Sequence, residues 1–447
     1  MLAAGVHPRA IDVFAAFYAQ LDSGATGMIR EADVDPLDGI DHASSVAVPD
    51  AVARDAAART VVIKLNGGLG TSMGLDRAKS LLPVRAGLSF LDVIAGQVRH
   101  VRETLDVRLP VLFMNSFRTR DDTLAALERY PDLAVDPLPL DFLQSSEPKL
   151  RQDDLTPVDW PADPSLEWCP PGHGDLYTAL QTSGILEQLL EQGYRYATVS
   201  NADNLGASPD PRMMGWFAST GAPYAAEVAR RTPADVKGGH LVVRRADGRL
   251  VLRETAQTAA EDAEAAADPT RHRYFHTNNL WFDLQALSDL LAERDGVMGL
   301  PLIRNLKTVD PSDPTSTPVV QIESAMGAAV EVFDGATAIE VERSRFLPVK
   351  TTNDLLLLRS DVYGVGADHL VRAQVDPPLV DLDRRFFTTI ADFDARIPTP
   401  PSLVDARSFT VRGDWRFGRD VVVEGDVVLD DSGEAQSVAA GERLQGR

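Results

Sequence analysis

The stretch VVIKLNGGLGTSMG, residues 61–74, joins an apolar run to a loop rich in glycine. Residues 61–65 are typical of a buried strand, and the glycines that follow allow the backbone to approach a ligand closely and point N–H groups at it. The loop is not a P-loop, because no Gly-Lys-Ser/Thr follows at the required offset. Met73 stands where the dinucleotide fingerprint has its third glycine, so a mononucleotide is favoured over a hydride-transfer cofactor. A purely structural loop remains the alternative.

Strands and helices alternate outward from this stretch. Further strands are predicted at residues 110–115 and 194–200, and helices at 89–103, 119–130, 175–192 and 211–220. This order predicts an α/β fold with a mostly parallel mixed sheet and helices on both faces. Ligands of such sheets lie beyond the C-terminal ends of the strands, where the loops that start at Asn66 and Asn201 should both open.

The flanking segments have weaker patterns. Residues 1–24 predict an amphipathic helix, and residues 33–58 are interpreted as a linker. Residues 241–253 carry a hairpin signal, whereas the acidic stretch 254–273 is interpreted as a solvated helix or mobile loop without chemistry. Near the C-terminus, Gly-Asp recurs after twelve residues, at 413 and 425, which predicts a short left-handed β-helix, with a plain hairpin as the alternative.

Composition limits the possible functions. At 447 residues the chain should form one large domain with appendages or two to three domains, and a net charge of −22 argues against nucleic-acid or anionic-membrane binding. Cys169 is the single cysteine, which excludes an internal disulfide. Arg9 and Asp12 interrupt the N-terminal apolar pattern, so a secretory signal is not expected, and neither is a membrane-spanning run. We expect a cytoplasmic location.

Lysine is rare in this chain. Only six of the 44 basic residues are lysine, namely Lys64, Lys79, Lys149, Lys237, Lys307 and Lys350. Lysine presents a compact point charge and arginine a broad planar fork, so retained lysines suggest cations packed around phosphate. Scattered surface lysines are the alternative.

Two further loops carry candidate binding groups. His173 lies between Gly172 and Gly174 just before a predicted helix, a geometry suited to an anion or a base edge. Asp203, in SNADNLGA (200–207), follows a predicted buried strand and should project into the crevice. One or two carboxylates together with substrate phosphates usually hold Mg²⁺, although a simple Asn- and Asp-rich turn is the alternative.

Four other motifs are weak when each is taken alone. They are ADVKGGHL (234–241), FHTNNLWF (275–282), NLKTVD (305–310) and SRFLPVKTTNDLL (344–356). Asn278 and Asn279 could hydrogen-bond sugar hydroxyls or a base. Three of the four motifs contain one of the rare lysines.

Together these motifs, in this order from about residue 60 to 365, resemble the eukaryotic-type UTP-glucose-1-phosphate uridylyltransferase family, also called UDP-glucose pyrophosphorylases. The resemblance implies a Rossmann-like nucleotidyltransferase domain at 59–365, after an N-terminal helical segment and linker at 1–58. A C-terminal domain with a short β-helix would occupy 366–447. The implied reaction converts UTP and glucose 1-phosphate into UDP-glucose and pyrophosphate with Mg²⁺, and it leaves the oligomeric state open.

The resemblance also assigns residues. The implied UTP-binding residues are Leu65, Asn66, Gly67, Gly68, Lys79, Gln144, Gly172, Asp203 and Lys350, with Gln144 reading the uracil. The implied sugar-phosphate and ribose contacts are His173, Asn201, Ala202, Asp203 and Asn278. Asp203 would bind Mg²⁺, and Lys79 and Lys350 would be catalytic.

Some positions depart from the family pattern. Ala78 replaces a proline before Lys79, and His276 replaces an asparagine before Thr277. None of these changes removes a charged group that the reaction needs. Because two polyanions react, catalysis should consist mainly of charge neutralisation and in-line alignment. The alternatives are a UDP-N-acetylhexosamine or broad-specificity UDP-sugar pyrophosphorylase, and a non-catalytic nucleotide-sugar sensor.

Overall fold

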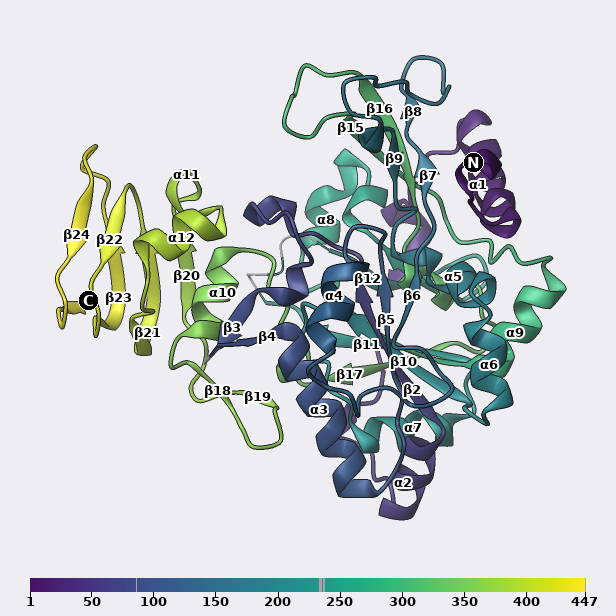
Figure 1. The fold of residues 1–447 in the computed structure, drawn as a ribbon, viewed down its shortest axis with the longest axis horizontal. Helices are drawn as coiled ribbons and strands as arrows, with labels where there is room; N and C mark the ends of the chain where they lie inside the picture. Colours follow the sequence, from purple (N-terminus) through teal and green to yellow (C-terminus); the bar gives the residue numbers. More distant parts are fainter. Residues whose placement is uncertain (86, 233–234, 236–237, 447) are drawn as a thin grey trace.

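A ten-stranded mixed sheet forms the centre of the molecule (Figure 1). The computed structural model describes residues 1–85, 87–232, 235 and 238–446. The strands of the central sheet are β1 (Val34–Pro36), β2 (Thr60–Asn66), β5 (Val111–Asn115), β6 (Asp141–Leu143), β10 (Tyr196–Asn201), β11 (Tyr224–Arg230), β12 (His240–Arg244), β13 (Leu250–Arg253), β14 (Tyr274–Asp283) and β17 (Thr337–Val341).

The sheet is mainly parallel in direction. Its main path has the order β1-β12-β14-β10-β2-β5-β6, and β11 pairs with the other edge of β14 and with β17. The pairs β10–β2, β2–β5, β5–β6 and β11–β17 are parallel. Only β1, β13 and β14 run against the other seven strands. The predicted α/β class is therefore confirmed.

Helices cover both faces of the sheet, as the apolar pattern requires. The helices are α1 (Pro8–Asp22), α2 (Asp50–Ala58), α3 (Phe90–Leu105), α4 (Arg120–Leu127), α5 (Leu176–Thr182), α6 (Ile185–Glu191), α7 (Pro211–Thr220), α8 (Ala263–Ala267), α9 (Leu284–Glu293), α10 (Thr352–Arg359), α11 (Arg384–Phe387) and α12 (Ile390–Arg396). Val62 packs with α2, α3 and α7, whereas Val61 and Ile63 pack with α1, α5, α6 and α9. Alternate residues of β2 thus pack into two hydrophobic cores, one on each face of the sheet.

Local signals set several boundaries. Ser89 caps α3 in a capping box with Asp92, where the sequence places the helix start. The predicted helix 175–192 is instead two helices, because Gly184 adopts a left-handed conformation with φ 73° between α5 and α6. Among the described residues, none of the helices combines the length and apolar character that crossing a bilayer requires.

Two segments are more ordered than the sequence suggests. The predicted linker 33–58 contributes β1 to the sheet, and α2 packs closely on α7, where a Cβ on Gly215 would lie 3.0 Å from Ala53 Cα. In the acidic stretch, Asp262 accepts a hydrogen bond from the Glu31 backbone at 2.8 Å, and the buried His272 ring contacts Glu31 at 3.0 Å. The linker interpretation was wrong because long-range pairing overrides weak local patterns. Within the acidic stretch the structure has the short helix α8, which agrees with the helix alternative for part of that segment. The predicted hairpin is confirmed as β12 and β13.

Smaller sheets surround the centre. The strands are β3 (Pro83–Arg85), β4 (Leu88–Ser89), β7 (Glu147–Pro148), β8 (Leu150–Arg151), β9 (Trp168–Cys169), β15 (Ile303–Thr308), β16 (Pro318–Glu323), β18 (Tyr363–Val365) and β19 (Val371–Ala373). The hairpin of β15 and β16 projects from the main body together with β8 (Figure 1).

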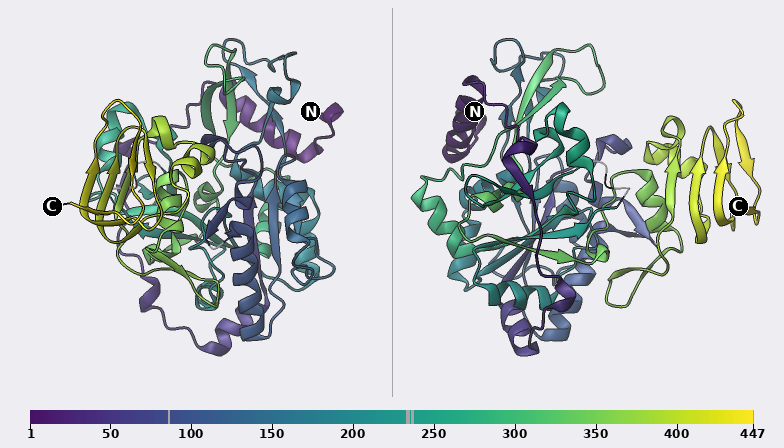
Figure 2. Two further views of the ribbon diagram at one scale, coloured as in Figure 1. Left: turned by 60° about the vertical axis from the view of Figure 1, so that its left-hand side comes forward. Right: turned by 180° about the vertical axis from the view of Figure 1, so that it is seen from behind.

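The C-terminal strands stack at one end of the molecule (Figure 2). They are β20 (Leu379–Leu382), β21 (Ser402–Val411), β22 (Trp415–Phe417), β23 (Val422–Leu429), β24 (Gln436–Val438) and β25 (Arg443–Gln445). All their pairings are parallel, which excludes the plain hairpin. Phe409 lies beside Val427 and Val422 beside Arg443, so one coil takes 18 to 21 residues. The twelve-residue Gly-Asp spacing is therefore not the structural repeat.

Candidate active site

Asp203 lies at the centre of a charged cluster beyond the C-terminal ends of β2 and β10. The turn that carries it is anchored by the Ala202 N–H, which donates to the Leu65 carbonyl at 3.0 Å. Asp203 Oδ2 lies 2.8 Å from Lys79 Nζ and 3.2 Å from Lys350 Nζ. Burial raises the pKa of Asp203, but the Lys350 and Lys79 ammonium groups outweigh it and hold the pKa below its usual value. The structure therefore brings the two predicted catalytic lysines together with the predicted Mg²⁺ ligand Asp203.

The two lysines differ in freedom. The side chain of Lys79 is 14% exposed, and its ammonium group also donates to the Val349 carbonyl. Gly70 lies against the stem of Lys79, since a Cβ there would sit 3.2 Å from Lys79 Cγ. The side chain of Lys350 is 56% exposed. Lys350 directly precedes Thr351, the N-cap of α10. Lys79 is thus fixed, while Lys350 can reach a ligand from solvent.

The glycine loop meets the predicted uracil-binding residue. The Gln144 backbone N–H donates to the Asn115 carbonyl at 2.9 Å, which fixes Gln144 beyond the end of β5. Its side chain lies against Gly67, where a Cβ would come within 2.8 Å of Gln144 Oε1. A side chain at Gly67 would therefore displace Gln144. At Gly68 the same position is open, and the Gly68 carbonyl accepts from the Lys79 N–H at 3.2 Å.

Asn66 and Leu65 make structural hydrogen bonds at the end of β2. Asn66 is buried, and its Nδ2 donates to Asn115 Oδ1 and Thr123 Oγ1, each at 2.8 Å. The carbonyl of Leu65 supports the Asp203 turn. These contacts connect β2, β5 and α4 directly beneath the loop, so the side-chain amide of Asn66 stabilises the strand end.

His173 lies in a loop that packs tightly on Ser324. Gly172 has φ 77°, and a Cβ there would lie 2.7 Å from the Ser324 carbonyl oxygen. His173 Nδ1 accepts a hydrogen bond from the Met326 N–H at 2.9 Å. Burial, together with the nearby charge of Lys350, lowers the pKa of His173 to about 4. At neutral pH the ring is uncharged, and its proton lies on Nε2.

Asn278 occupies an irregularity in β14. It has φ 57°, and the pairing of β14 with β11 shifts register between Ala226 and Val228. A bulge of this kind re-aims a side chain, and Asn278 remains partly exposed while its neighbours on β14 are buried. The ring of His276 accepts from the Asn278 N–H at 3.1 Å. Burial lowers the pKa of His276 to about 4, and the ring lies near enough to His173 for their charges to interact.

The other lysines do not join the cluster. Lys64 is buried and donates to Ser200 Oγ and the Ala207 carbonyl, both at 2.7 Å, and burial lowers its pKa to about 7. Lys149 is buried and donates to the Val309 carbonyl at 2.8 Å, whereas Lys307 contacts Gln321 at the surface. Lys237 lies outside the described residues. Of the five lysines that the structure describes, Lys79 and Lys350 meet at Asp203, and for these two the phosphate-binding hypothesis stays a prediction.

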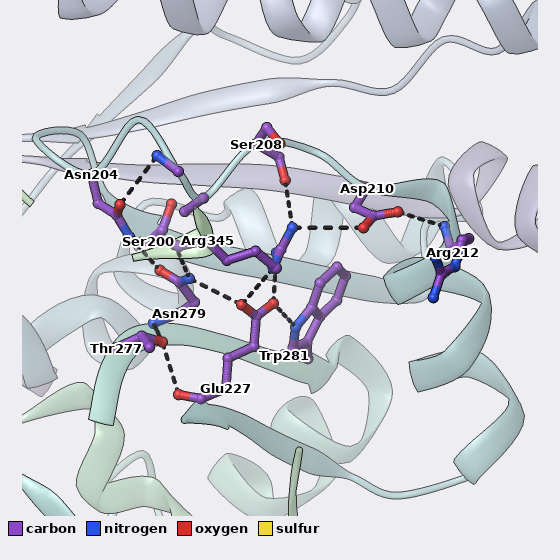
Figure 3. Close-up of polar contacts among 12 residues, drawn as sticks. Ser200, Asn204, Ser208, Asp210, Arg212, Glu227, Thr277, Asn279, Trp281 and Arg345 are labelled. Atoms are coloured by element: carbon purple, nitrogen blue, oxygen red, sulfur yellow. Dashed lines mark hydrogen bonds and ion pairs between the residues drawn. The ribbon is translucent and has the colours of Figure 1, made fainter. Parts of the chain in front are cut away.

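Sequence reasoning missed two acidic groups. Glu227 and Arg345 form a buried ion pair, and Asn204, the residue after Asp203, donates to the Arg345 carbonyl (Figure 3). Glu254, in the stretch interpreted as lacking chemistry, lies against Gly239, and burial raises its pKa to about 7. Neither Glu227 nor Glu254 lies in a distinctive local motif. Only the position of Glu254 directly after a predicted strand could have drawn attention to it.

The donor set at Asp203 fits a magnesium ion. Among the residues that the structure describes, no three His, Cys, Asp or Glu side chains gather into a metal site. Mg²⁺ typically takes one or two carboxylates and completes its shell with substrate phosphates and water, so a single partly exposed carboxylate suffices. A zinc or calcium site would need more protein ligands.

Comparisons with known proteins identify the family of the chain. The family model described as UTP-glucose-1-phosphate uridylyltransferase matches residues 11–424. A UTP-glucose-1-phosphate uridylyltransferase from Saccharomyces cerevisiae is 40% identical over 375 residues, which cover 83% of this chain and 74% of that protein. A probable enzyme of the same name from Schizosaccharomyces pombe is 38% identical, covering 85% and 74%.

Solved structures match along the whole chain. The UDP-glucose phosphorylase of Trypanosoma brucei has a TM-score of 0.93 at 42% identity and covers 100% of this chain and 97% of its own. A variant of UDP-glucose pyrophosphorylase from Leishmania major, in complex with UDP-glucose, has a TM-score of 0.93 at 41% identity, with the same two coverages. The chain therefore belongs to the UTP-glucose-1-phosphate uridylyltransferase family.

Proposed function

We propose that the chain transfers the uridylyl group of UTP to glucose 1-phosphate, forming UDP-glucose and pyrophosphate. Membership of the family supports this activity. The observation that carries it is the convergence of Lys79 and Lys350 on Asp203, beyond the ends of two parallel strands. A site for two polyanionic substrates on a protein with a net charge of −22 requires such a local concentration of cations.

The reaction is an in-line displacement at the α-phosphorus of UTP. A phosphate oxygen of glucose 1-phosphate forms the new P–O bond, and the bond to the bridging oxygen breaks, so that pyrophosphate leaves with that oxygen. Negative charge builds on the transferred group and on the leaving group, where Lys79 and Lys350 offset it. Asp203 would hold Mg²⁺, which when bound supplies further positive charge. In the unliganded protein the two ammonium groups neutralise Asp203 until the phosphates compete for them.

The remaining predicted residues would bind the rest of the substrates. Gln144, held by Gly67, offers both a donor and an acceptor to the uracil edge. The neutral His173 ring can donate from Nε2 to a phosphate or ribose oxygen. We assign Asn278 to the glucose hydroxyls and the turn at Asn201 and Ala202 to the sugar phosphate. Gly172 would pack on the base.

The division of the chain at residues 58 and 365 is part of the proposal. The three parts are packed together. The first part adds β1 to the central sheet, and one apolar core continues through α10 and α12 into the C-terminal strands. We propose that those strands form a short left-handed β-helix, which their parallel coils of 18 to 21 residues support. We also propose a cytoplasmic location.

A substrate panel tests the activity. Pyrophosphate release is measured for UTP, CTP and TTP, each with glucose 1-phosphate, galactose 1-phosphate or N-acetylglucosamine 1-phosphate, with and without Mg²⁺. We expect Mg²⁺-dependent release with UTP and glucose 1-phosphate above all other pairs. Equal or faster release with another sugar would favour a broad-specificity or N-acetylhexosamine enzyme. Absence of release from every pair would favour a nucleotide-sugar sensor.

A further inference from the structure

A buried ion pair between Glu227 and Arg345 lies among the polar contacts of Asn204, Asn279 and Trp281 (Figure 3). Glu227, on β11, has a fully buried side chain, and the side chain of Arg345, which ends the short helix Arg343–Arg345, is 12% exposed. Arg345 Nε donates to Glu227 Oε2 at 2.9 Å, and Nη2 donates to Oε1 at 2.7 Å. Asn279 Nδ2 and Trp281 Nε1 donate to the same carboxylate at 3.0 and 2.9 Å. Four donors hold this carboxylate in one orientation.

The same group of residues holds the backbone that leads to Lys350. The carbonyl of Arg345 accepts from Asn204 Nδ2 at 3.2 Å and from Asn279 Nδ2 at 3.1 Å. Asn204 Oδ1 in turn accepts from the Leu347 N–H at 2.8 Å. Asn204 follows Asp203 directly, so the catalytic turn and the 345–350 segment share one hydrogen-bond network.

Backbone contacts extend this network to the reacting groups. The Val349 N–H donates to the Asp203 carbonyl at 3.2 Å, and the Val349 carbonyl accepts from Lys79. Gly206 allows the two segments to touch, because a Cβ there would lie 2.4 Å from the Ser344 carbonyl oxygen. A shift of Arg345 would therefore move Lys350 relative to Asp203.

We propose that Glu227 and Arg345 are positioning residues for uridylyl transfer. Their ion pair holds the 345–350 segment in the position that presents Lys350 to Asp203. Glu227 is fully buried, so it acts through this segment and not on the substrates. The inference rests on the proposed catalytic role of Lys350.

A double-mutant cycle separates positioning from stability. Glu227→Gln keeps the shape of the side chain but removes its charge, and we expect kcat to fall about 10- to 100-fold, as for other residues that orient a catalytic group, with KM for UTP changing less than about threefold. In a Lys350→Ala background the same change should lower kcat less than about threefold, because the group that it positions is already absent. Pyrophosphate release at saturating Mg²⁺ measures all four proteins.

The matched control is Asp283→Asn. Asp283 is also a buried carboxylate, paired with Arg195 at 2.6 Å, and it lies on β14 like Asn279 and Trp281, but next to the opposite end of β10. We expect its kcat to equal that of the unmodified protein. If Glu227→Gln fails to fold, Arg345→Lys serves instead, since it keeps the charge and loses the planar fork, and we expect a smaller fall in kcat.

Two results would overturn the inference. If the Glu227→Gln protein folds with a lowered Tm but an unchanged kcat, the ion pair only stabilises the fold. Equal losses with and without Lys350 would mean that Glu227 does not act through Lys350. A Lys350→Ala protein with near-normal activity would instead refute the catalytic role itself, and with it this inference, so the two failures are distinguishable.

Discussion

A carboxylate lies next to a cation at each end of strand β10, but the two carboxylates have different partners. At the N-terminal end, Asp283 accepts from Arg195 and from the N–H groups of Gln285 and Ala286, which begin α9. Two of these three partners are main-chain groups. At the C-terminal end, Asp203 meets two lysines from distant segments, one of them half exposed.

This difference separates the proposed reactive site at Asp203 from the structural ion pair at Asp283. At the Asp283 end the partners are main-chain groups and an arginine fork, which stabilise a helix start. At the Asp203 end the partners are compact ammonium groups that can exchange the carboxylate for phosphate oxygens. Ligand binding thus requires cations whose present partner can be replaced.

The largest loss is expected for Lys79→Ala. This change removes a preorganised cation and leaves Asp203 with one cationic partner, so kcat should fall about 1000-fold, the upper range for a single transition-state donor. Initial rates of pyrophosphate release provide the measurement, and Lys79→Arg is the control that keeps the charge. A rate within about threefold of the unmodified protein would place Lys79 with the structural pairs.

The second loss concerns the metal. Asp203→Asn removes the proposed Mg²⁺ ligand but keeps a side chain of the same shape, so half-maximal activity should need about 10- to 100-fold more Mg²⁺. A Mg²⁺ titration of activity at fixed UTP measures the shift. An unchanged titration curve would remove Asp203 from the metal site and would make the two ends of β10 more alike than we propose.

A third prediction concerns the buried Lys64, which lies one strand away from the cluster. Burial lowers its pKa from 10.5 to about 7, so between pH 7 and 10.5 the unfolded chain binds more protons than the folded one. The contribution of Lys64 to stability therefore rises with pH across this window. We expect Lys64→Met to reduce the rise of Tm between pH 7 and 9.5, measured by thermal melts. Parallel curves for the two proteins would show that Lys64 does not titrate there.

The smallest effect is expected at the opposite end of β10. The side chain of Arg195 is 52% exposed, so Asp283→Asn should lower the free energy of unfolding by only about 0.5 to 1 kcal/mol, and kcat should stay the same. Urea denaturation and the pyrophosphate assay together check this pair of outcomes. A clear loss of activity in a stable protein would contradict the separation of the two ends.

Local chemistry made much of the fold predictable. The strand before the glycine loop, the Ser89 cap and the helix 211–220 follow from apolar runs and capping residues that lie close together in sequence. The short strand β1 could not be predicted, because its three residues are ordered by pairing with β12, some 200 positions later. The break between α5 and α6 at Gly184 was also not predicted, since one glycine does not by itself end a helix.

The candidate site also contains residues that the sequence identified and residues that it did not. Lys79, Asp203 and Lys350 were identified because each lies in a patterned loop, and the structure brings them together. Glu227 was not identified, because no motif marks its strand. Arg345 lies in the motif 344–356 but was not singled out, because its partner Glu227 is 118 residues away in the sequence.

The activity of Lys350→Ala tests the central claim most directly. Lys350 is half exposed and its loss opens no buried cavity, so a change in rate reports chemistry and not folding. With UTP, glucose 1-phosphate and saturating Mg²⁺, we predict a kcat about 100- to 1000-fold below that of the unmodified protein, with an unchanged Tm. Near-normal UDP-glucose formation by this variant would contradict the account.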